Sequence, residues 1–413
     1  MQELFADHTF HRRGYRLIIF AILVLCLPAF FVNLGIYQLI DDESIRAVVA
    51  LEMKLSGDYV TPTIGGEFYY KKPPLFNWII AFGYTLSDHY SELTPRVINL
   101  IFLFIYAGTI FLVIRKRYGL RAGFLSAILL LVSGRILIYE SLYGLIDITY
   151  SWLIFSNFIL IYYLFRRGRI LPLFLVSYTI TGITFLLKGL PPIAFQGITL
   201  LVAAYGERRI RTLFSWKHLV GALPFIAIVG SYYLSYYLKN PGQFPTLVNT
   251  LFNESVDKSA VSYGFNEIVI NIFSYSLEII YSFLPGTLLL LFFLKRKPLQ
   301  PIKQDPFLLY ISRVFIFNII IYLVSPVTYL RYVLMLVPLA FILFVFYYAQ
   351  HKKIRSWQVK LIDTAALLSP FLLLTALPLL PVMKVTGFVD HAWLKAALLM
   401  AGTVAILFLA VKR

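Results

Sequence analysis

The chain is poor in charge and in cysteine. Only 14% of its 413 residues are charged while 60% are hydrophobic, a balance that excludes an ordinary soluble globular protein. The single cysteine, Cys26, excludes an intramolecular disulfide. The glycine-rich loops that cradle phosphates in P-loop and dinucleotide-binding proteins are also missing, so no nucleotide site is expected.

Long apolar runs are plentiful. They are repeatedly about 20 residues long, which is the length a helix needs to cross the hydrocarbon core of a bilayer. They predict an all-α polytopic membrane protein of about twelve spans. The spans are expected to begin near Leu17, Val97, Ala122, Ile146, Leu171, Leu190, His218, Tyr275, Phe307, Tyr332, Val359 and Ala392.

The net charge of +17 comes from basic clusters that fall in alternate loops. These clusters lie at residues 12–16, 115–121, 166–169, 208–211, 295–297 and 352–355. The positive-inside rule places all of them, and both termini, in the cytoplasm. The charge therefore indicates topology and contact with anionic membrane lipids. Nucleic-acid binding is not expected, because the Lys and Arg residues form no stripe and no recognised fold.

Acidic residues gather just after the first apolar run. The segment from Asp41 to Pro74 holds six of the twenty acidic residues of the chain. Carboxylates at a membrane edge are expensive and usually functional, so this segment predicts an active site that faces away from the cytoplasm. Within it, the apolar periodicity of Ser44 to Ser56 predicts an amphipathic interfacial helix, which Gly57 should end.

The rest of this segment defines the first outer loop, which we place at residues 41–96. Gly65 and Gly66 mark a turn, and the apolar stretch from Leu75 to Thr85 is too short to span, so it predicts a second interfacial helix. A second outer loop is expected at residues 239–274. We expect one transmembrane domain over residues 1–413, with no C-terminal soluble domain. No cleavable signal peptide is expected either, because the first span is long and lacks a small-residue cleavage site.

An ordered set of short motifs resembles one known family. The motifs are Asp42-Glu43, Glu52-Met53, Gly57-Asp58-Tyr59-Val60-Thr61-Pro62, Lys72-Pro73-Pro74, Tyr118-Gly119, Arg121-Ala122-Gly123, Leu145-Ile146-Asp147 and Leu187-Lys188-Gly189. They resemble the ArnT-like glycosyltransferases of the GT-C fold, which are related to dolichyl-phosphate-mannose-protein mannosyltransferases. The resemblance fades after about Pro192, although Phe252-Asn253-Glu254 and Leu284-Pro285-Gly286-Thr287 still look similar. It implies inverting sugar transfer from a polyprenyl-phosphate carrier, such as undecaprenyl phosphate, to an acceptor at the outer face.

Three carboxylates are the catalytic candidates. A hydroxyl acceptor needs a base as it attacks, and Asp42, which matches the catalytic Asp of the family, is the candidate base. Glu43 would orient the acceptor or share a metal. Asp147 would lie on the opposite wall of the cavity, where it would hold Lys72 or the sugar hydroxyls.

Cationic groups are expected on the donor side. The leaving phosphate gathers negative charge, so fixed cations stabilise the transition state. The donor-phosphate candidates are Lys72, which matches the family Lys that contacts lipid phosphate, and Lys188, Arg331 and Tyr332. Candidates for contact with the acceptor, from the outer loops, are Glu254, Tyr59 and Tyr70.

Plainer roles stay open for most of these residues. Acidic residues cap helices, lysines snorkel to headgroups, aromatic and basic residues pair at interfaces, and loops are solvated. The capping role applies to Asp42-Glu43 and Asp147, and the snorkelling role applies to Lys72 and Lys188. The interfacial pair is Arg331-Tyr332, and the solvated loop is the one that holds Glu254 and Asp257.

One position departs from the family pattern. The residue before Lys72 is typically a Glu that helps to hold a metal with His residues of the later outer loop; here it is Lys71, and Lys239 to Asn271 contains no His. Zinc needs several converging ligands, so a structural zinc site is predicted to be absent, and a role for another divalent cation stays open. This departure weakens aminoarabinose as the sugar, and the lack of a C-terminal soluble domain weakens lipid A as the acceptor. Another glycolipid, a glycan and a protein are the alternatives.

A lipid or polysaccharide transporter or flippase of the cell envelope is the main alternative function. Transporters place polar groups in broken helices near the middle of the membrane, whereas these carboxylates gather at one face, which favours the enzyme. A catalytically inactive relative that serves in assembly is a third reading. No organelle signal is visible, which favours a bacterial inner membrane with the active site on the periplasmic face.

Overall fold

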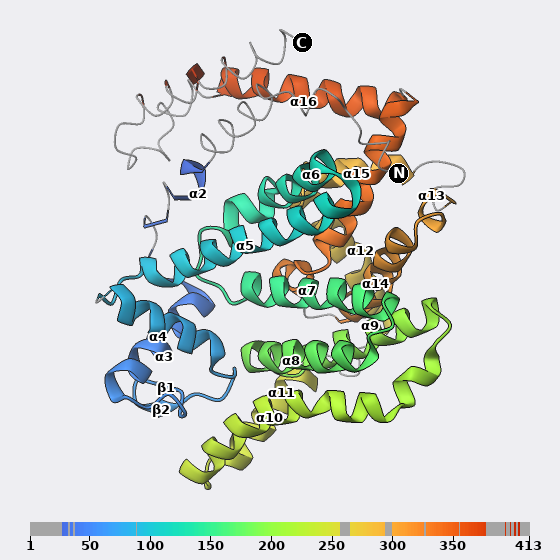
Figure 1. The fold of residues 1–413 in the computed structure, drawn as a ribbon. Helices are drawn as coiled ribbons and strands as arrows, with labels where there is room; N and C mark the ends of the chain where they lie inside the picture. The colour runs from blue at the N-terminus through green and yellow to red at the C-terminus, as the bar shows by residue number, and fades with distance from the viewer. Residues whose placement is uncertain are drawn as a thin grey trace. The chain divides into compact units, whose positions relative to one another are not determined.

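The computed structural model describes residues 27–31, 34–35, 38–87, 89–256, 265–293, 300–325, 328–354 and 356–376, and isolated positions beyond residue 392. The described chain is helical apart from one short hairpin, which confirms the all-α prediction (Figure 1). It divides into two compact units, Met1–Thr287 with Arg296–Val345, and Leu288–Lys295 with Phe346–Arg413. The features that position the site all lie in the first unit.

The first outer loop contains two helices and the hairpin. Helix α3 (Asp41–Ser56) ends at Gly57, whose φ of 70° is left-handed, as the sequence predicts. The helix begins three residues earlier than expected, because acidic residues in its first turn favour the helix N-terminus. Strands β1 (Thr63–Ile64) and β2 (Glu67–Phe68) flank the predicted turn, where Gly65 and Gly66 have φ values of 61° and 80°. Helix α4 (Leu75–Ser87) is the second predicted interfacial helix.

Five described helices are long and apolar enough to cross a membrane. They are α5 (Leu93–Tyr118), α7 (Asp147–Arg166), α8 (Ile170–Lys188), α10 (Trp216–Lys239) and α14 (Pro306–Leu323). A sixth span results if the bent pair α12 (Phe265–Ser282) and η6 (Gly286–Phe293) counts as one. The predicted spans from Leu17 and Ala392 lie outside the described residues, so the number twelve stays a prediction.

Shorter elements complete the chain. Helices α6 (Leu120–Leu131) and α9 (Pro191–Gly206) are apolar but short. The remaining elements are α2 (Pro28–Phe31), η3 (Ile136–Glu140), η4 (Ile210–Phe214), α11 (Phe244–Val256), α13 (Gln300–Lys303), η7 (Leu330–Val333), α15 (Val337–Lys353) and α16 (Trp357–Ala376). The span expected from Tyr332 begins later, because Tyr332 lies in the η7 turn and α15 starts at Val337, just before Pro338.

Helix α7 is central to the bundle and packs against α5, α8, α9 and α14. A chain of interhelical hydrogen bonds links it to α9 and α8: Asn157 Nδ2 of α7 donates to Gln196 Oε1 of α9 at 2.8 Å, and Gln196 Nε2 donates to Ser177 Oγ of α8 at 2.9 Å. Such polar contacts fix the register of helices in a membrane. Asp147 begins α7 and Arg166 ends it, so the two residues lie about 28 Å apart, at opposite ends of the helix.

Candidate active site

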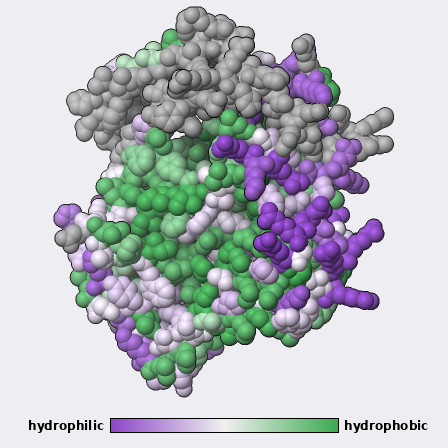
Figure 2. Space-filling view, in the orientation of Figure 1, coloured by the Kyte–Doolittle hydropathy of each residue, from purple (hydrophilic) through white to green (hydrophobic). Residues whose placement is uncertain are grey.

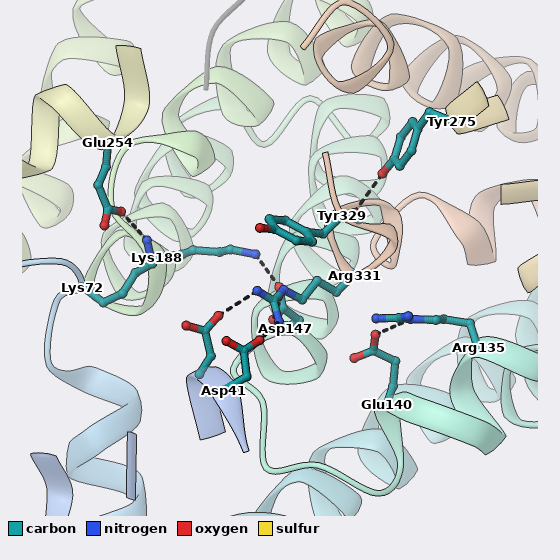
Figure 3. A network of polar contacts seen from close by, with 11 residues as sticks. Asp41, Lys72, Arg135, Glu140, Asp147, Lys188, Glu254, Tyr275, Tyr329 and Arg331 are labelled. Carbon is teal, nitrogen blue, oxygen red and sulfur yellow. Dashed lines mark hydrogen bonds and ion pairs between the residues drawn. The ribbon is translucent and has the colours of Figure 1, made fainter. Parts of the chain in front are cut away.

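A cavity of about 230 Å³ lies at the end of α7 where Asp147 stands. Charged and aromatic side chains from both outer loops and from η7 converge there (Figure 3). Its lining residues are Asp41, Asp42, Ile45, Arg46, Tyr69, Lys71, Lys72, Leu145, Ile146, Asp147, Lys188, Glu254, Tyr329, Arg331 and Tyr332. Six of the seven residues predicted to be catalytic or to bind phosphate therefore share one cavity, with Glu43 as the exception.

Arg331 is the centre of the charge network. Its Nη2 donates to Asp42 Oδ2 at 2.7 Å, and its Nε lies 3.7 Å from Asp147 Oδ2. Nη1 lies 3.8 Å from Asp41 Oδ2, and the guanidinium lies over the Tyr329 ring at 4.8 Å. The side chain of Arg331 is 9% exposed against 40% for Asp42, so the carboxylate reaches solvent and the guanidinium does not. The short η7 turn presents Arg331 between two carboxylates that come from α3 and α7.

Lys188 and Asp147 form an ion pair where α8 ends and α7 begins. The Lys188 ammonium also lies 4.3 Å from the centroid of the Tyr332 ring and 5.0 Å from that of Tyr150. An aromatic face attracts a cation, so these rings hold the ammonium toward the cavity. Asp147 is 2% exposed, and it contacts both Arg331 and Lys188. The sequence predicts Asp147 on the opposite wall of the cavity, where it would hold Lys72 or the sugar hydroxyls. In the structure Asp147 holds Lys188 and Arg331 instead, because Lys72 pairs with Glu254.

Lys72 forms an ion pair with Glu254 and so joins the two outer loops (Figure 3). Two further bonds join the same loops: Lys239 Nζ lies 2.7 Å from Asp58 Oδ2, and Tyr70 donates to Gln243 Oε1 at 2.6 Å. Glu254 thus lies in the cavity as a partner of Lys72. Tyr70 contributes to the junction between the loops and does not line the cavity.

Glu43 lies outside the cavity. It is fully buried, and it accepts hydrogen bonds from Arg96 Nε at 2.8 Å and Nη2 at 3.0 Å. The amide of Gly144 donates to the same carboxylate at 2.7 Å. Successive residues of a helix point about 100° apart, which explains why Asp42 faces the cavity while its neighbour faces the core. The geometry favours a structural role for Glu43.

Tyr59 is also separate from the cavity. The residue is 42% exposed, and its carbonyl accepts a hydrogen bond from Trp78 Nε1 at 2.7 Å. Asp257 lies outside the described residues.

A hydrogen-bonded carboxylate, Glu52, shapes the first outer loop. Glu52 accepts hydrogen bonds from Thr63 Oγ1 at 2.6 Å and from the amides of Gly65 and Gly66 at 2.5 and 3.4 Å. Partial burial acts to raise the pKa of Glu52, but these three hydrogen bonds outweigh it and lower the pKa below its ordinary value. The ionised Glu52 therefore ties the hairpin to α3.

Several cavity residues were not predicted. Asp41 and Tyr329 belong to no motif, so only the fold shows that they line the cavity. Arg46 follows Asp42 by four positions, so the helical spacing could have placed both on one face. Its Nη2 donates to the hydroxyl of Tyr69 at 2.8 Å, and burial of that hydroxyl raises the pKa of Tyr69.

Four carboxylates line the cavity, but they are not grouped as metal ligands. Within the described ranges, no group of three or more His, Cys, Asp or Glu side chains is arranged to hold a metal ion. Lys71, which occupies the position of the metal-binding Glu of the family, lines the cavity wall as a cation. The prediction that a structural zinc site is absent stays a prediction.

The fold is similar to solved structures of one enzyme. The crystal structure of ArnT from Cupriavidus metallidurans bound to undecaprenyl phosphate matches with a TM-score of 0.67 and 19% identity, over 94% of this chain and 70% of that one. The chain has the ArnT-like GT-C fold. The apo structure of the same ArnT matches equally, at a TM-score of 0.67 and 20% identity, over 96% of this chain and 71% of that one.

Sequence comparisons agree with the ArnT-like fold. The family model for dolichyl-phosphate-mannose-protein mannosyltransferase matches residues 71–233, a range that includes Lys72, Asp147 and Lys188. An uncharacterized protein of Aquifex aeolicus is 27% identical over 274 residues, which are 66% of this chain and 52% of that protein. The undecaprenyl phosphate-α-4-amino-4-deoxy-L-arabinose arabinosyl transferase of Pseudomonas savastanoi pv. phaseolicola is 25% identical over 216 residues, 50% of this chain and 38% of that one. The chain thus spans about half, or less, of the length of these relatives.

Proposed function

We propose that the chain is an integral-membrane glycosyltransferase that moves a sugar from a polyprenyl-phosphate donor to an envelope acceptor. The observation that carries the proposal is the single cavity in which Lys72, Lys188 and Arg331 lie beside Asp42 and Asp147. Cations that are held in place by carboxylates suit the binding of a phosphate, and a carboxylate that reaches solvent suits the acceptance of a proton. The fold of ArnT, one of whose structures contains undecaprenyl phosphate, supports this donor class.

The donor phosphate would change the partner of Arg331. The guanidinium now donates to Asp42, and a phosphate oxygen that enters the cavity competes for the same N–H groups. Arginine binds phosphate and carboxylate with the same planar array of N–H donors, so the guanidinium need move little when one replaces the other. Asp42 is then released beside the sugar, while Asp147 continues to hold Lys188 and Arg331 toward the phosphate.

The chemical step is a single displacement that inverts the anomeric centre. The acceptor hydroxyl oxygen forms a bond to the anomeric carbon, and its proton passes to the Asp42 carboxylate. The bond between the anomeric carbon and the phosphate oxygen breaks, and its electron pair stays on the phosphate. The carrier leaves as a polyprenyl phosphate monoester with one more negative charge than in the donor, which Lys72, Lys188 and Arg331 stabilise.

The orientation of the chain is part of the proposal. The cavity lies at the end of α7 that is opposite Arg166, and the positive-inside rule puts the basic end in the cytoplasm. The site then opens to the periplasmic face of a bacterial inner membrane. The acceptor is a glycolipid, a glycan or a protein available there.

A transfer assay tests the proposal. Purified protein in detergent is given radiolabelled polyprenyl-phosphate sugars and an envelope extract, and wild type is compared with Asp42→Asn and with Glu67→Gln. Glu67 is an exposed carboxylate of the hairpin outside the cavity, so it is the matched control. Label should reach an acceptor with wild type and Glu67→Gln but not with Asp42→Asn. Intact donor binding without transfer from any donor in wild type would favour transport instead.

A further inference from the structure

A second cavity lies at the opposite end of α7. It has a volume of about 240 Å³ and lies between the ends of α7, α9 and α14, with α13 at its side. Its charged residues are Arg166, Glu207, Lys303 and Arg313, and apolar side chains such as Phe165 and Leu309 line the rest of its wall. Figure 2 shows hydrophilic residues gathered along the right edge of this view, beside a broad hydrophobic surface.

Arg313 is the unusual member of this cavity. It lies seven residues after Pro306, the first residue of α14, and so about 10 Å along a helix that is long enough to span. Within the described residues its guanidinium makes no ion pair or hydrogen bond. A methyl group at Gly206 would lie 3.3 Å from Arg313 Nη1, so the guanidinium lies close to the glycine at the end of α9. A charged side chain inside a membrane helix is costly and usually indicates function.

The charge of the cavity is unbalanced. Its one carboxylate, Glu207, lies 3.2 Å from Arg166 Nη1, and this pair is partly exposed, at 31% and 45%. Lys303 and Arg313 are then left with positive charge that no lining carboxylate offsets. A basic pocket between membrane helices that also has an apolar wall matches the headgroup and the first acyl carbons of an anionic lipid.

We propose that this cavity binds the phosphate of an anionic glycerophospholipid from the leaflet opposite the active site. Arg313 and Lys303 bind the phosphate, and Arg166 stays with Glu207 at the rim. The apolar wall receives the start of the acyl chains. The bound lipid bridges α9 and α14, both of which pack against α7, the helix that carries Asp147.

Native mass spectrometry of the full chain in detergent tests this site. Phosphatidylglycerol and phosphatidylcholine are titrated separately against wild type, Arg313→Gln, Lys303→Gln and Arg211→Gln. Arg211 is an exposed arginine of η4 that does not line the cavity, so it is the matched control. Loss of a charge-assisted contact should weaken phosphatidylglycerol binding by about tenfold in Arg313→Gln. A smaller loss is expected for the exposed Lys303→Gln, and none for Arg211→Gln.

The same titrations can overturn the proposal. Equal affinity of wild type for the two lipids, or an equal loss in the control and the cavity variants, would contradict it. Inorganic phosphate that displaces phosphatidylglycerol at equal concentration would assign the cavity to a soluble anion. If Arg313→Gln does not fold, the exposed Lys303→Gln decides alone: unchanged phosphatidylglycerol affinity in that variant would reject the site.

Discussion

Arg331 Nη2 donates to Asp42 Oδ2 at 2.7 Å, across 289 residues of sequence. The candidate base and a candidate phosphate ligand are thus partners of one another. Asp147 approaches the same guanidinium from the other side, with its Oδ2 at 3.7 Å from Nε. In the proposed function, a donor phosphate would compete with these carboxylates, and this competition would give Asp42 a role in donor binding as well as in proton transfer.

Asp42→Asn should separate these two roles. Removal of the base should lower single-turnover transfer by at least about a hundredfold. Removal of the competing charge should leave donor affinity unchanged or tighter, because Arg331 is freed for the phosphate. Single-turnover kinetics and a binding titration with a polyprenyl-phosphate sugar measure the two effects. Near-normal transfer by the well-folded variant would rule out Asp42 as the base.

Lys72→Ala should act on donor binding. Lys72 lies in the cavity wall and pairs with Glu254, so its loss removes one phosphate cation and also one link between the outer loops. We expect the donor dissociation constant to rise by about tenfold, more than for Asp42→Asn. Isothermal titration with the same donor measures the change.

Glu254→Gln is the matched control for Lys72. It breaks the same link between the loops but leaves the cation, so it should retain donor affinity if Lys72 binds the phosphate itself. Equal weakening in both variants would show that the link matters and the cation does not.

The first outer loop was the part of the fold that the sequence specified best. Its charge density, the helical period of Ser44 to Ser56 and the two glycine positions are local signals, and each corresponds to an observed element. The hairpin was missed because its strands are only two residues long, too short for a period-2 pattern. What holds that hairpin to α3 is a contact of Glu52, which has no sequence signature of its own.

The prediction of the site residues rested on the family resemblance more than on local sequence pattern. Asp42 and Lys72 lie in recognisable motifs, but their distance from Arg331 along the chain leaves no local signal of contact. Glu43 illustrates the limit, because a motif names neighbouring residues without saying which way each one points. The distinction between the buried Glu43, which pairs with Arg96 of α5, and the solvent-reaching Asp42 comes only from the three-dimensional structure.

Glu43→Gln should reduce stability. It leaves the buried Arg96 without its carboxylate partner, and loss of one member of a buried pair costs about 3–5 kcal/mol of unfolding free energy. Unfolding in detergent, followed by circular dichroism, measures the loss. The double variant Glu43→Gln with Arg96→Gln should recover part of it. A variant of normal stability with impaired transfer would point instead to a role for Glu43 at the acceptor.

Glu52 should make the first outer loop sensitive to acid. Its pKa in the folded chain is lowered from its ordinary value of 4.5, so the unfolded chain takes up the proton at a higher pH than the folded chain does. The stabilisation is therefore present above pH 4.5 and is lost as the pH falls through the lowered pKa. Between pH 5 and 7, Glu52→Gln should be less stable than wild type by about 1 kcal/mol, since the hydrogen bonds are partly screened by solvent.

Thermal unfolding from pH 3 to pH 7 measures the stability of both proteins, and their curves should converge at the acid end. Glu67→Gln, which alters an exposed carboxylate of the same hairpin, should follow wild type throughout. A constant difference between Glu52→Gln and wild type across this range would mean that the charge of Glu52 contributes nothing to the hairpin.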